Sequence, residues 1–175
     1  MTGDAAEEDA GDAEVGADVG ARDAGVPRVA VSVNAVIRDG AGRVLVVKPT
    51  YKSGWTLPGG QMEADGETPW EACRREVLEE CGLNVAGGRL RAVDFRRPRP
   101  GHSGGMRVVF DCGVVDEAAV AGIVVQEGEI AEFRFAAADT ADGLLRPAVR
   151  RRLRAVLATE TVVYLEEGFP VEGVG

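Results

Sequence analysis

The sequence predicts an α/β protein in which a mixed β-sheet is sandwiched between α-helices. Segments rich in β-branched residues alternate with two amphipathic segments, in the order strand, strand, helix, strands, helix. A chain of 175 residues is long enough for one domain with its own core. We therefore expect an acidic disordered tail over residues 1–26, one domain over residues 27–166, and a flexible C-terminus over residues 167–175.

The predicted strands begin with a hairpin. Residues 29–37 (VAVSVNAVI) and 43–48 (RVLVVK) are rich in β-branched side chains, and the turn sequence Asp-Gly-Ala-Gly lies between them. Further strand-like segments cover residues 90–96, 106–115, 132–136 and 162–165. A loop rich in Arg, Pro and Gly, over residues 97–105, separates the first two of these segments.

The clearest predicted helix lies between Thr68 and Gly82. Thr68-Pro69-Trp70-Glu71 reads as a capping box, with proline at the first helical position. Gly82 stands where a left-handed residue commonly ends a helix. Apolar side chains at three- and four-residue steps predict the buried face, formed by Trp70, Cys73, Val77 and Cys81.

A second amphipathic helix is predicted over residues 147–159. Its apolar face is formed by Val149, Leu153, Val156 and Leu157. The helix also carries Arg150, Arg151, Arg152 and Arg154. We interpret these arginines as a solvated face rather than as a nucleic-acid site.

The net charge of −9 is concentrated at the N-terminus. Residues 1–25 carry eight acidic residues and one basic residue, with few apolar side chains, so they are expected to be disordered. The rest of the chain is close to neutral, which does not favour nucleic acid as a partner.

Three cysteines without a CxxC pair favour a reducing cytoplasm over a zinc site. The sequence shows neither an apolar run long enough to span a membrane nor a signal-peptide pattern. We expect a cytoplasmic protein with no membrane partner, and a homodimer is left open.

Three carboxylates gather on one side of the first helix. Glu76, Glu79 and Glu80 stand at i, i+3 and i+4, and Arg75 supplies a single positive charge beside them. A hard divalent cation would relieve their repulsion. Oxygen ligands without Cys or His favour Mg²⁺, with Mn²⁺ as a substitute. The alternative interpretation is a solvated acidic face.

The surrounding motif favours the metal. Leu-Pro-Gly-Gly at residues 57–60 precedes the helix, and residues 75–83 read REVLEECGL. The whole segment resembles the Nudix box: a glycine, a glutamate after five residues, and after seven more the run Arg-Glu-apolar-any-Glu-Glu-any-Gly-apolar. One departure is that six residues, not five, separate Gly60 from Glu67. We expect a slightly longer loop before an intact helix.

The resemblance implies the Nudix fold, a metal-dependent hydrolase of phosphoanhydride bonds, and a role for each matching residue. Glu76, Glu79 and Glu80 would ligate the metal, with the main-chain carbonyl of Gly59 as a further ligand. Arg75 would orient Glu76 during catalysis. Structural support within the box would come from Glu67, Gly60 and Gly82.

The family also recruits a carboxylate from a downstream loop as a ligand or general base. Glu127, Glu129 and Glu132 are the candidates, and we select Glu129. His102 is instead interpreted as a surface or substrate-contact residue.

Substrate contacts are predicted for Arg97 and Arg99 in the loop and for Trp55 as a base-stacking residue. Pro98 follows Leu83 by 15 residues, a spacing associated within the family with ADP-ribose hydrolases. The favoured substrate is therefore a nucleoside diphosphate derivative resembling ADP-ribose. The alternatives are a nucleoside triphosphate pyrophosphatase, a biosynthetic diphosphate hydrolase and, in a different class, a non-catalytic nucleotide-sensing regulator.

Overall fold

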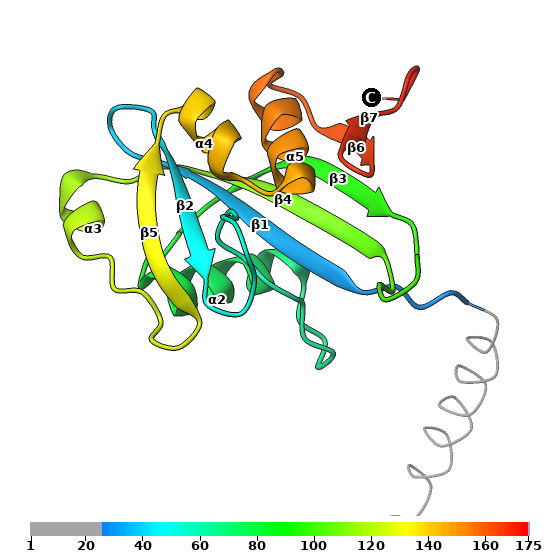
Figure 1. The fold of residues 1–175 in the computed structure, drawn as a ribbon, viewed down its shortest axis with the longest axis horizontal. Coiled ribbons are helices and arrows are strands. Elements are labelled where there is room, and N and C mark those ends of the chain that lie inside the picture. Colours follow the sequence, from blue (N-terminus) through cyan, green and yellow to red (C-terminus); the bar gives the residue numbers. More distant parts are fainter. Residues whose placement is uncertain (1–25, 175) are drawn as a thin grey trace, which may run out of the picture.

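A computed structural model describes residues 26–174, and a seven-stranded mixed sheet forms its centre (Figure 1). The strands are β1 (Val31–Arg38), β2 (Val44–Pro49), β3 (Arg89–Arg96), β4 (Gly105–Val114), β5 (Ile130–Ala136), β6 (Val163–Glu166) and β7 (Phe169–Pro170). Their spatial order is β5-β2-β1-β4-β3-β6-β7. The pairs β1–β4 and β3–β6 are parallel and the other neighbours are antiparallel.

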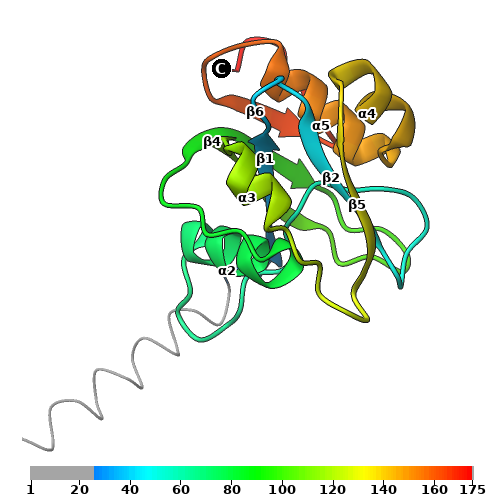
Figure 2. The same ribbon diagram turned by 90° about the vertical axis from the view of Figure 1, so that its left-hand side faces the viewer.

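Helices cover both faces of this sheet (Figure 2). Helix α2 (Pro69–Cys81) packs on one face, and the short helix α3 (Glu117–Ala121) lies on the same side. Helices α4 (Ala138–Leu144) and α5 (Pro147–Leu157) pack on the other face. The predicted α/β fold, with the sheet between helices, is confirmed. Within residues 26–174, no helix has the length and apolar character needed to cross a bilayer.

The alternation of side chains along the strands builds two cores. In β1, Val33, Ala35 and Ile37 face the α2 side, whereas Val36 faces the α5 side. All four side chains are buried, because β1 lies in the middle of the sheet. The central strands are therefore apolar on both faces, as expected for strands covered by helices on each side.

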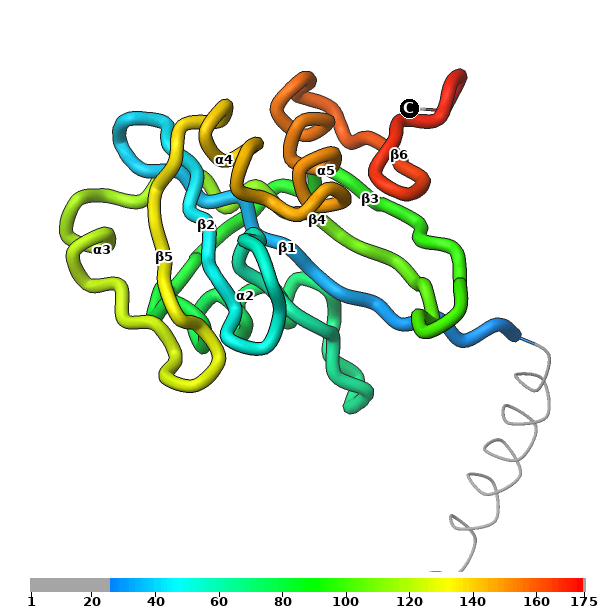
Figure 3. The backbone as a smooth tube through the Cα atoms, in the orientation of Figure 1, coloured from blue at the N-terminus to red at the C-terminus, as the bar shows by residue number. Residues whose placement is uncertain are grey.

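The connection between β2 and α2 is built into the sheet. β1 and β2 pair only at Arg38 and Val44, and the chain over residues 55–61 fills the gap between the two strands (Figure 3). On one side, the amide and carbonyl of Thr56 pair with Val47, both at 2.9 Å. On the other side, the carbonyls of Pro58 and Gly60 accept hydrogen bonds from β1. This segment therefore holds Gly59 and Gly60 rigidly beside α2.

Three elements were not predicted. The five-residue helix α3 has no buried residue, α4 buries only Ala141, and β7 is two residues long, so none shows a full hydrophobic period. The paired structure continues past residue 166, because β7 pairs with β6 and Gly168 donates to the buried carboxylate of Asp94 at 2.8 Å. The acidic tail over residues 1–26 falls outside the described residues except for Val26.

Candidate active site

Helix α2 is the frame of the site, and its ends are set by local sequence. The Thr68 hydroxyl accepts from the Glu71 amide, and the Glu71 carboxylate accepts from the Thr68 amide at 2.8 Å, which completes the predicted capping box. Gly82 ends the helix with φ 67°, as predicted. Cys73, Val77 and Cys81 are fully buried against the sheet. The opposite face of the helix carries the acidic residues of the box.

Arg75 ties these acidic residues together. Its guanidinium donates to both carboxylate oxygens of Glu67, at 2.8 and 3.0 Å. It also reaches Glu76 at 3.0 Å and Glu79 at 3.1 Å. The pKa of Arg75 is raised, chiefly by the hydrogen bonds to Glu67 and then by Glu76. The fork of five donors therefore lets one cation orient three carboxylates, a geometry that lysine cannot reproduce.

Glu80 lies against the Gly59 backbone. Its carboxylate accepts a hydrogen bond of 2.7 Å from the Gly59 amide, and the residue is only 4% exposed. Burial raises the pKa of Glu80 to about 8, and the nearby charges of Glu76 and Glu129 add to this effect. A buried carboxylate with one hydrogen-bond donor is short of positive charge.

The two glycines that precede the helix are required by close packing. Gly59 has φ 132°, and a Cβ there would lie 2.2 Å from the carbonyl oxygen of Val33. A Cβ on Gly60 would lie 2.3 Å from a carboxylate oxygen of Glu76. Burial raises the pKa of Glu76, as it does for Glu80. The absence of side chains at Gly59 and Gly60 thus lets the backbone approach both carboxylates.

The extra residue of the box lies in an exposed turn. The Asp65 carboxylate accepts from the Glu67 amide at 3.1 Å, and Gly66 has φ 97°. The Glu63 amide donates to Glu67 at 2.8 Å, which closes the turn. The longer loop predicted from the sequence is present, and α2 and the Gly59–Gly60 segment are regular on either side of it.

Among the three downstream carboxylates, Glu129 is the one whose charge acts on the carboxylates of α2. Its charge acts on the pKa values of both Glu76 and Glu80. Its backbone carbonyl accepts from the Thr50 amide at 2.8 Å, which ties the loop to the end of β2. Glu132 instead pairs with Arg134 at 2.5 Å and with Lys48 at 4.0 Å.

The donor set suits a divalent cation of the magnesium type. Glu76, Glu79 and Glu80 would supply carboxylate oxygens. The Gly59 carbonyl accepts none of the hydrogen bonds formed within residues 26–174, whereas the carbonyls on either side of it are bonded to β1. No three acidic, His or Cys side chains in this part of the chain already form a closed metal cage. The ion pairs of Arg75 and the Gly59 amide hold the carboxylates in this arrangement.

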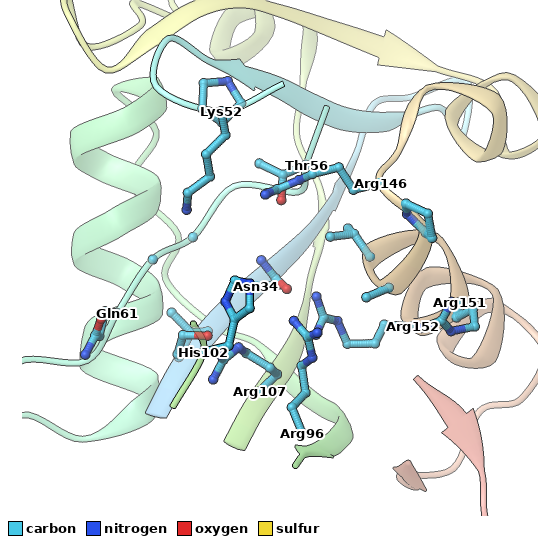
Figure 4. Close-up of a pocket in the computed structure, with 18 of the residues that line it drawn as sticks. Asn34, Lys52, Thr56, Gln61, Arg96, His102, Arg107, Arg146, Arg151 and Arg152 are labelled. Atoms are coloured by element: carbon cyan, nitrogen blue, oxygen red, sulfur yellow. The ribbon is translucent and has the colours of Figure 1, made fainter. Parts of the chain in front are cut away.

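A cavity of about 950 Å³, part of whose lining is drawn in Figure 4, reaches Glu80, whereas Glu76, Glu79 and Glu129 lie outside its lining. Glu80, Gly59, Gly60 and Gln61 line its acidic end. It extends across Asn34 on β1 and Arg107 on β4 to the first turn of α5. We call the far part its basic end, which is lined by Arg96, Arg107, Arg146 and Arg152. The volume is in the range of pockets that take nucleotide-sized ligands.

The predicted substrate residues separate into two groups. Arg99 lines the cavity, together with His102. Arg97 is exposed and donates to Glu166 at 2.8 Å, outside the cavity lining. Trp55 is buried in the α5-side core, where Arg134 lies 4.3 Å over its ring. The structure therefore does not bring Arg97 or Trp55 to the cavity.

Several lining residues were not predicted from the sequence. Lys52 points into the cavity from the loop after β2, and burial lowers its pKa. Arg107 could have been identified from the sequence, because it is a charged residue within an apolar strand. The interpretation of the α5 arginines as a solvated face is wrong for Arg152, which is 4% exposed and pairs with Asp94 at 3.1 Å.

The fold and the site together define an α/β domain that has a carboxylate-bearing helix at one end of a cavity and a group of arginines at the other end. Residues 28–158 match the NUDIX domain family, and the chain belongs to that family. The assignment predicted from residues 57–83 is confirmed.

Curated relatives match parts of the chain. A "MutT-like protein" of Streptomyces ambofaciens is 37% identical over 49% of this chain and 53% of its own length. An "RNA pyrophosphohydrolase" of Halorhodospira halophila is 37% identical over 39% of this chain and 40% of its own length. The chain thus spans about half the length, or less, of these two relatives.

Solved structures match a larger share of the chain. A MutT protein from Methanosarcina mazei is 26% identical, with a TM-score of 0.60 over 74% of this chain and 91% of that one. A structure described as UDP-X diphosphatase has a TM-score of 0.66 over 87% of this chain and 74% of that one. At 24% identity the second shows the shared fold alone.

Proposed function

We propose that the protein is a Mg²⁺-dependent pyrophosphohydrolase that cleaves a diphosphate linkage in a nucleoside diphosphate derivative. The observation that supports this most is the position of Glu80 beside the free Gly59 carbonyl, in a cavity whose far end is lined by arginines. The acidic end suits a hard divalent cation, and the arginines suit phosphate oxygens.

The proposed chemistry follows from charge. A diphosphate repels an approaching hydroxide, because both are anions. When bound by Glu76, Glu79, Glu80 and the Gly59 carbonyl, Mg²⁺ would neutralise phosphate oxygens and lower the pKa of a coordinated water. Glu129 is the proposed general base, since it is exposed beside the same carboxylates. Arg75 is the proposed positioning residue for Glu76 and Glu79.

The names of the relatives agree on the kind of bond and differ on the substrate. They include an RNA pyrophosphohydrolase and a human diphosphoinositol polyphosphate phosphohydrolase. These names support cleavage of a diphosphate in this chain. ADP-ribose is kept as the proposed substrate because of the 15-residue spacing between Leu83 and Pro98. Pro98 itself lies outside the cavity lining.

The test is a substrate panel with Mg²⁺, with release of phosphate, pyrophosphate or nucleoside monophosphate as the readout. The panel covers ADP-ribose, nucleotide sugars, dinucleoside polyphosphates, nucleoside triphosphates and isoprenoid diphosphates. We expect turnover that stops in excess chelator and falls by several orders of magnitude in Glu76→Gln and Glu80→Gln. Activity that persists in chelator would reject the metal-dependent mechanism. Binding of a nucleotide without any turnover would favour the non-catalytic sensor.

Glu129 has a matched control in the same loop. Glu127 is exposed two residues away. Glu129→Gln is expected to lower kcat far more than Glu127→Gln. If Glu127→Gln has the larger effect, the general base is Glu127.

A further inference from the structure

The basic end of the cavity concentrates positive charge from three separate elements. Arg96 ends β3, Arg107 lies on β4, and Arg152 lies in the second turn of α5. Figure 4 shows their side chains converging on one region of the cavity. Burial lowers the pKa of Arg107, and the charge of Arg96 lowers it further. The three guanidinium groups are thus close enough to destabilise one another.

The fold does not neutralise this charge fully. The buried carboxylate of Asp94 accepts from Arg152 at 3.1 Å, and Glu167 reaches Arg96 at 3.4 Å. Within residues 26–174, Arg107 makes no ion pair and donates only to backbone carbonyls. The Nε of Arg152 is buried without a partner. Three buried or half-buried cations therefore face two carboxylates.

The first turn of α5 adds backbone donors to the same end. Arg146 is the N-cap but makes no side-chain cap hydrogen bond. Ala148 and Val149 line the cavity, and amides in the first helical turn have no partner inside the helix. The positive end of the helix dipole therefore faces the arginine group.

The composition of the lining disfavours a neutral ligand at this end. Tyr51 and His102 are the only aromatic rings among the residues that line the cavity, so the basic end offers little surface for stacking a base. A neutral sugar would leave the charge of Arg107 desolvated and without an anionic partner, which is costly. A phosphate group would accept hydrogen bonds from both the arginines and the helix amides.

We infer that the basic end is a subsite for a phosphate group that the substrate carries in addition to the diphosphate that is cleaved. This inference rests on the proposed function, because that function identifies the bond that is cleaved. Binding of a phosphate group at the basic end does not itself require turnover. The substrate class is a nucleoside diphosphate derivative with a further phosphomonoester, placed away from the scissile linkage. The cavity would then bind one anionic group at each end.

The first experiment compares substrates that differ by one phosphate, with Mg²⁺ present. Suitable pairs are ADP-ribose 2′-phosphate with ADP-ribose, and coenzyme A with dephospho-coenzyme A. We expect kcat/KM to be roughly tenfold to a hundredfold higher for the phosphorylated member, the range of one or two charge-assisted hydrogen bonds. Equal kcat/KM within every pair that is cleaved would overturn the inference and leave the proposed function standing.

The second experiment measures binding without catalysis. In the presence of EDTA, the protein is titrated with adenosine 5′-monophosphate and with adenosine, neither of which contains a diphosphate. We expect tighter binding of the monophosphate, by roughly tenfold. Equal affinity for the two ligands would overturn the subsite even if no substrate of the panel is cleaved, a result that would separately reject the proposed function.

Arg107→Gln is the diagnostic variant for both experiments. Because Arg107 forms no ion pair with a described residue and its charge is disfavoured there, the variant should fold at least as stably as the wild type. It should lose the preference for the additional phosphate. Arg89→Gln is the matched control, since Arg89 begins the neighbouring strand β3 and is 69% exposed. A preference retained in Arg107→Gln, or lost equally in Arg89→Gln, would contradict the assignment.

Discussion

Glu80 shows how a single residue can be unfavourable for the fold and useful for the site. Its ordinary pKa is 4.5, and in the folded protein the pKa is about 8, chiefly because of burial. The folded state therefore binds the proton more tightly than the unfolded chain does. The resulting stability is fully present below about pH 4.5 and is lost as the pH rises through about 8.

Replacing Glu80 with Gln should remove this loss. The amide oxygen can still accept from the Gly59 amide, but no charge is buried. At pH 8 and without metal, Glu80→Gln is expected to be roughly 2–4 kcal/mol more stable than the wild type, with a much smaller difference at pH 5. Denaturant unfolding in EDTA at both pH values measures the difference in the free energy of unfolding between the variant and the wild type. Glu79→Gln, at a half-exposed carboxylate, is the control. A gain for Glu80→Gln that is the same at both pH values would contradict the explanation.

Arg75 is the residue whose geometry, rather than charge alone, supports the site. Arg75→Lys keeps one positive charge and loses the planar fork that reaches Glu67, Glu76 and Glu79. We expect a loss of roughly 1–3 kcal/mol in stability, a lower kcat, and a shift of the Mg²⁺ dependence to higher concentration. Arg74 is the exposed neighbour, and Arg74→Lys should leave the stability, kcat and the Mg²⁺ dependence unchanged. An unaltered Mg²⁺ dependence in Arg75→Lys would remove the positioning role.

At the scale of elements, α2 and the preceding loop differ in how they tolerate a change of length. The extra residue lies in the exposed turn over residues 63–66, where the ends of the turn are fixed by Glu67. In contrast, a residue added within α2 rotates every following side chain by about 100°. The spacing inside the helix is therefore the part of the motif that the site depends on.

This difference gives a test by deletion and insertion. Deleting Ala64 restores the five-residue spacing and should preserve both the fold and turnover within a fewfold, because the turn is exposed. Inserting one alanine after Leu78 should abolish turnover, since it turns Glu79 and Glu80 away from Glu76. Circular dichroism and the substrate assay measure both variants. A deletion variant that folds but loses turnover would show that the longer loop contributes to the site.

At the scale of the whole molecule, the described domain encloses its own core and cavity. The first strand, β1, begins at Val31 in the middle of the sheet, and the lining of the cavity begins at Ser32. The acidic residues 1–25 hold most of the net charge and few apolar side chains. We therefore predict that they are dispensable for folding and chemistry.

A chain that begins at Pro27 tests this prediction. Its melting temperature and its kcat/KM should match those of the full chain within twofold, measured at low and at physiological salt. Removal of the tail removes acidic charge. If the shortened chain binds the substrate more tightly at low salt but not at physiological salt, reduced electrostatic repulsion explains the difference. Loss of most of the turnover in a folded protein would assign the tail a role in the site.

The features that the sequence predicted are those set by residues close together in the chain. The capping box, the apolar stripe of α2 and the terminating Gly82 depend on neighbours within one or two turns, and all three are present. The main strands follow from local runs of β-branched residues, but the predicted hairpin is present only where Arg38 of β1 pairs with Val44 of β2. Likewise, the Nudix box is a contiguous motif, so the family could be predicted from residues 57–83 alone.

The tertiary structure alone decided which side chains share the cavity. Arg96, Arg107 and Arg152 are separated by as many as 56 positions in the sequence, and only the pairing of β3 with β4 and the packing of α5 bring them together. Arg152 looked solvated because helical periodicity says nothing about what covers the polar face. Burial of a charge depends on long-range partners such as Asp94, and no local pattern encodes them.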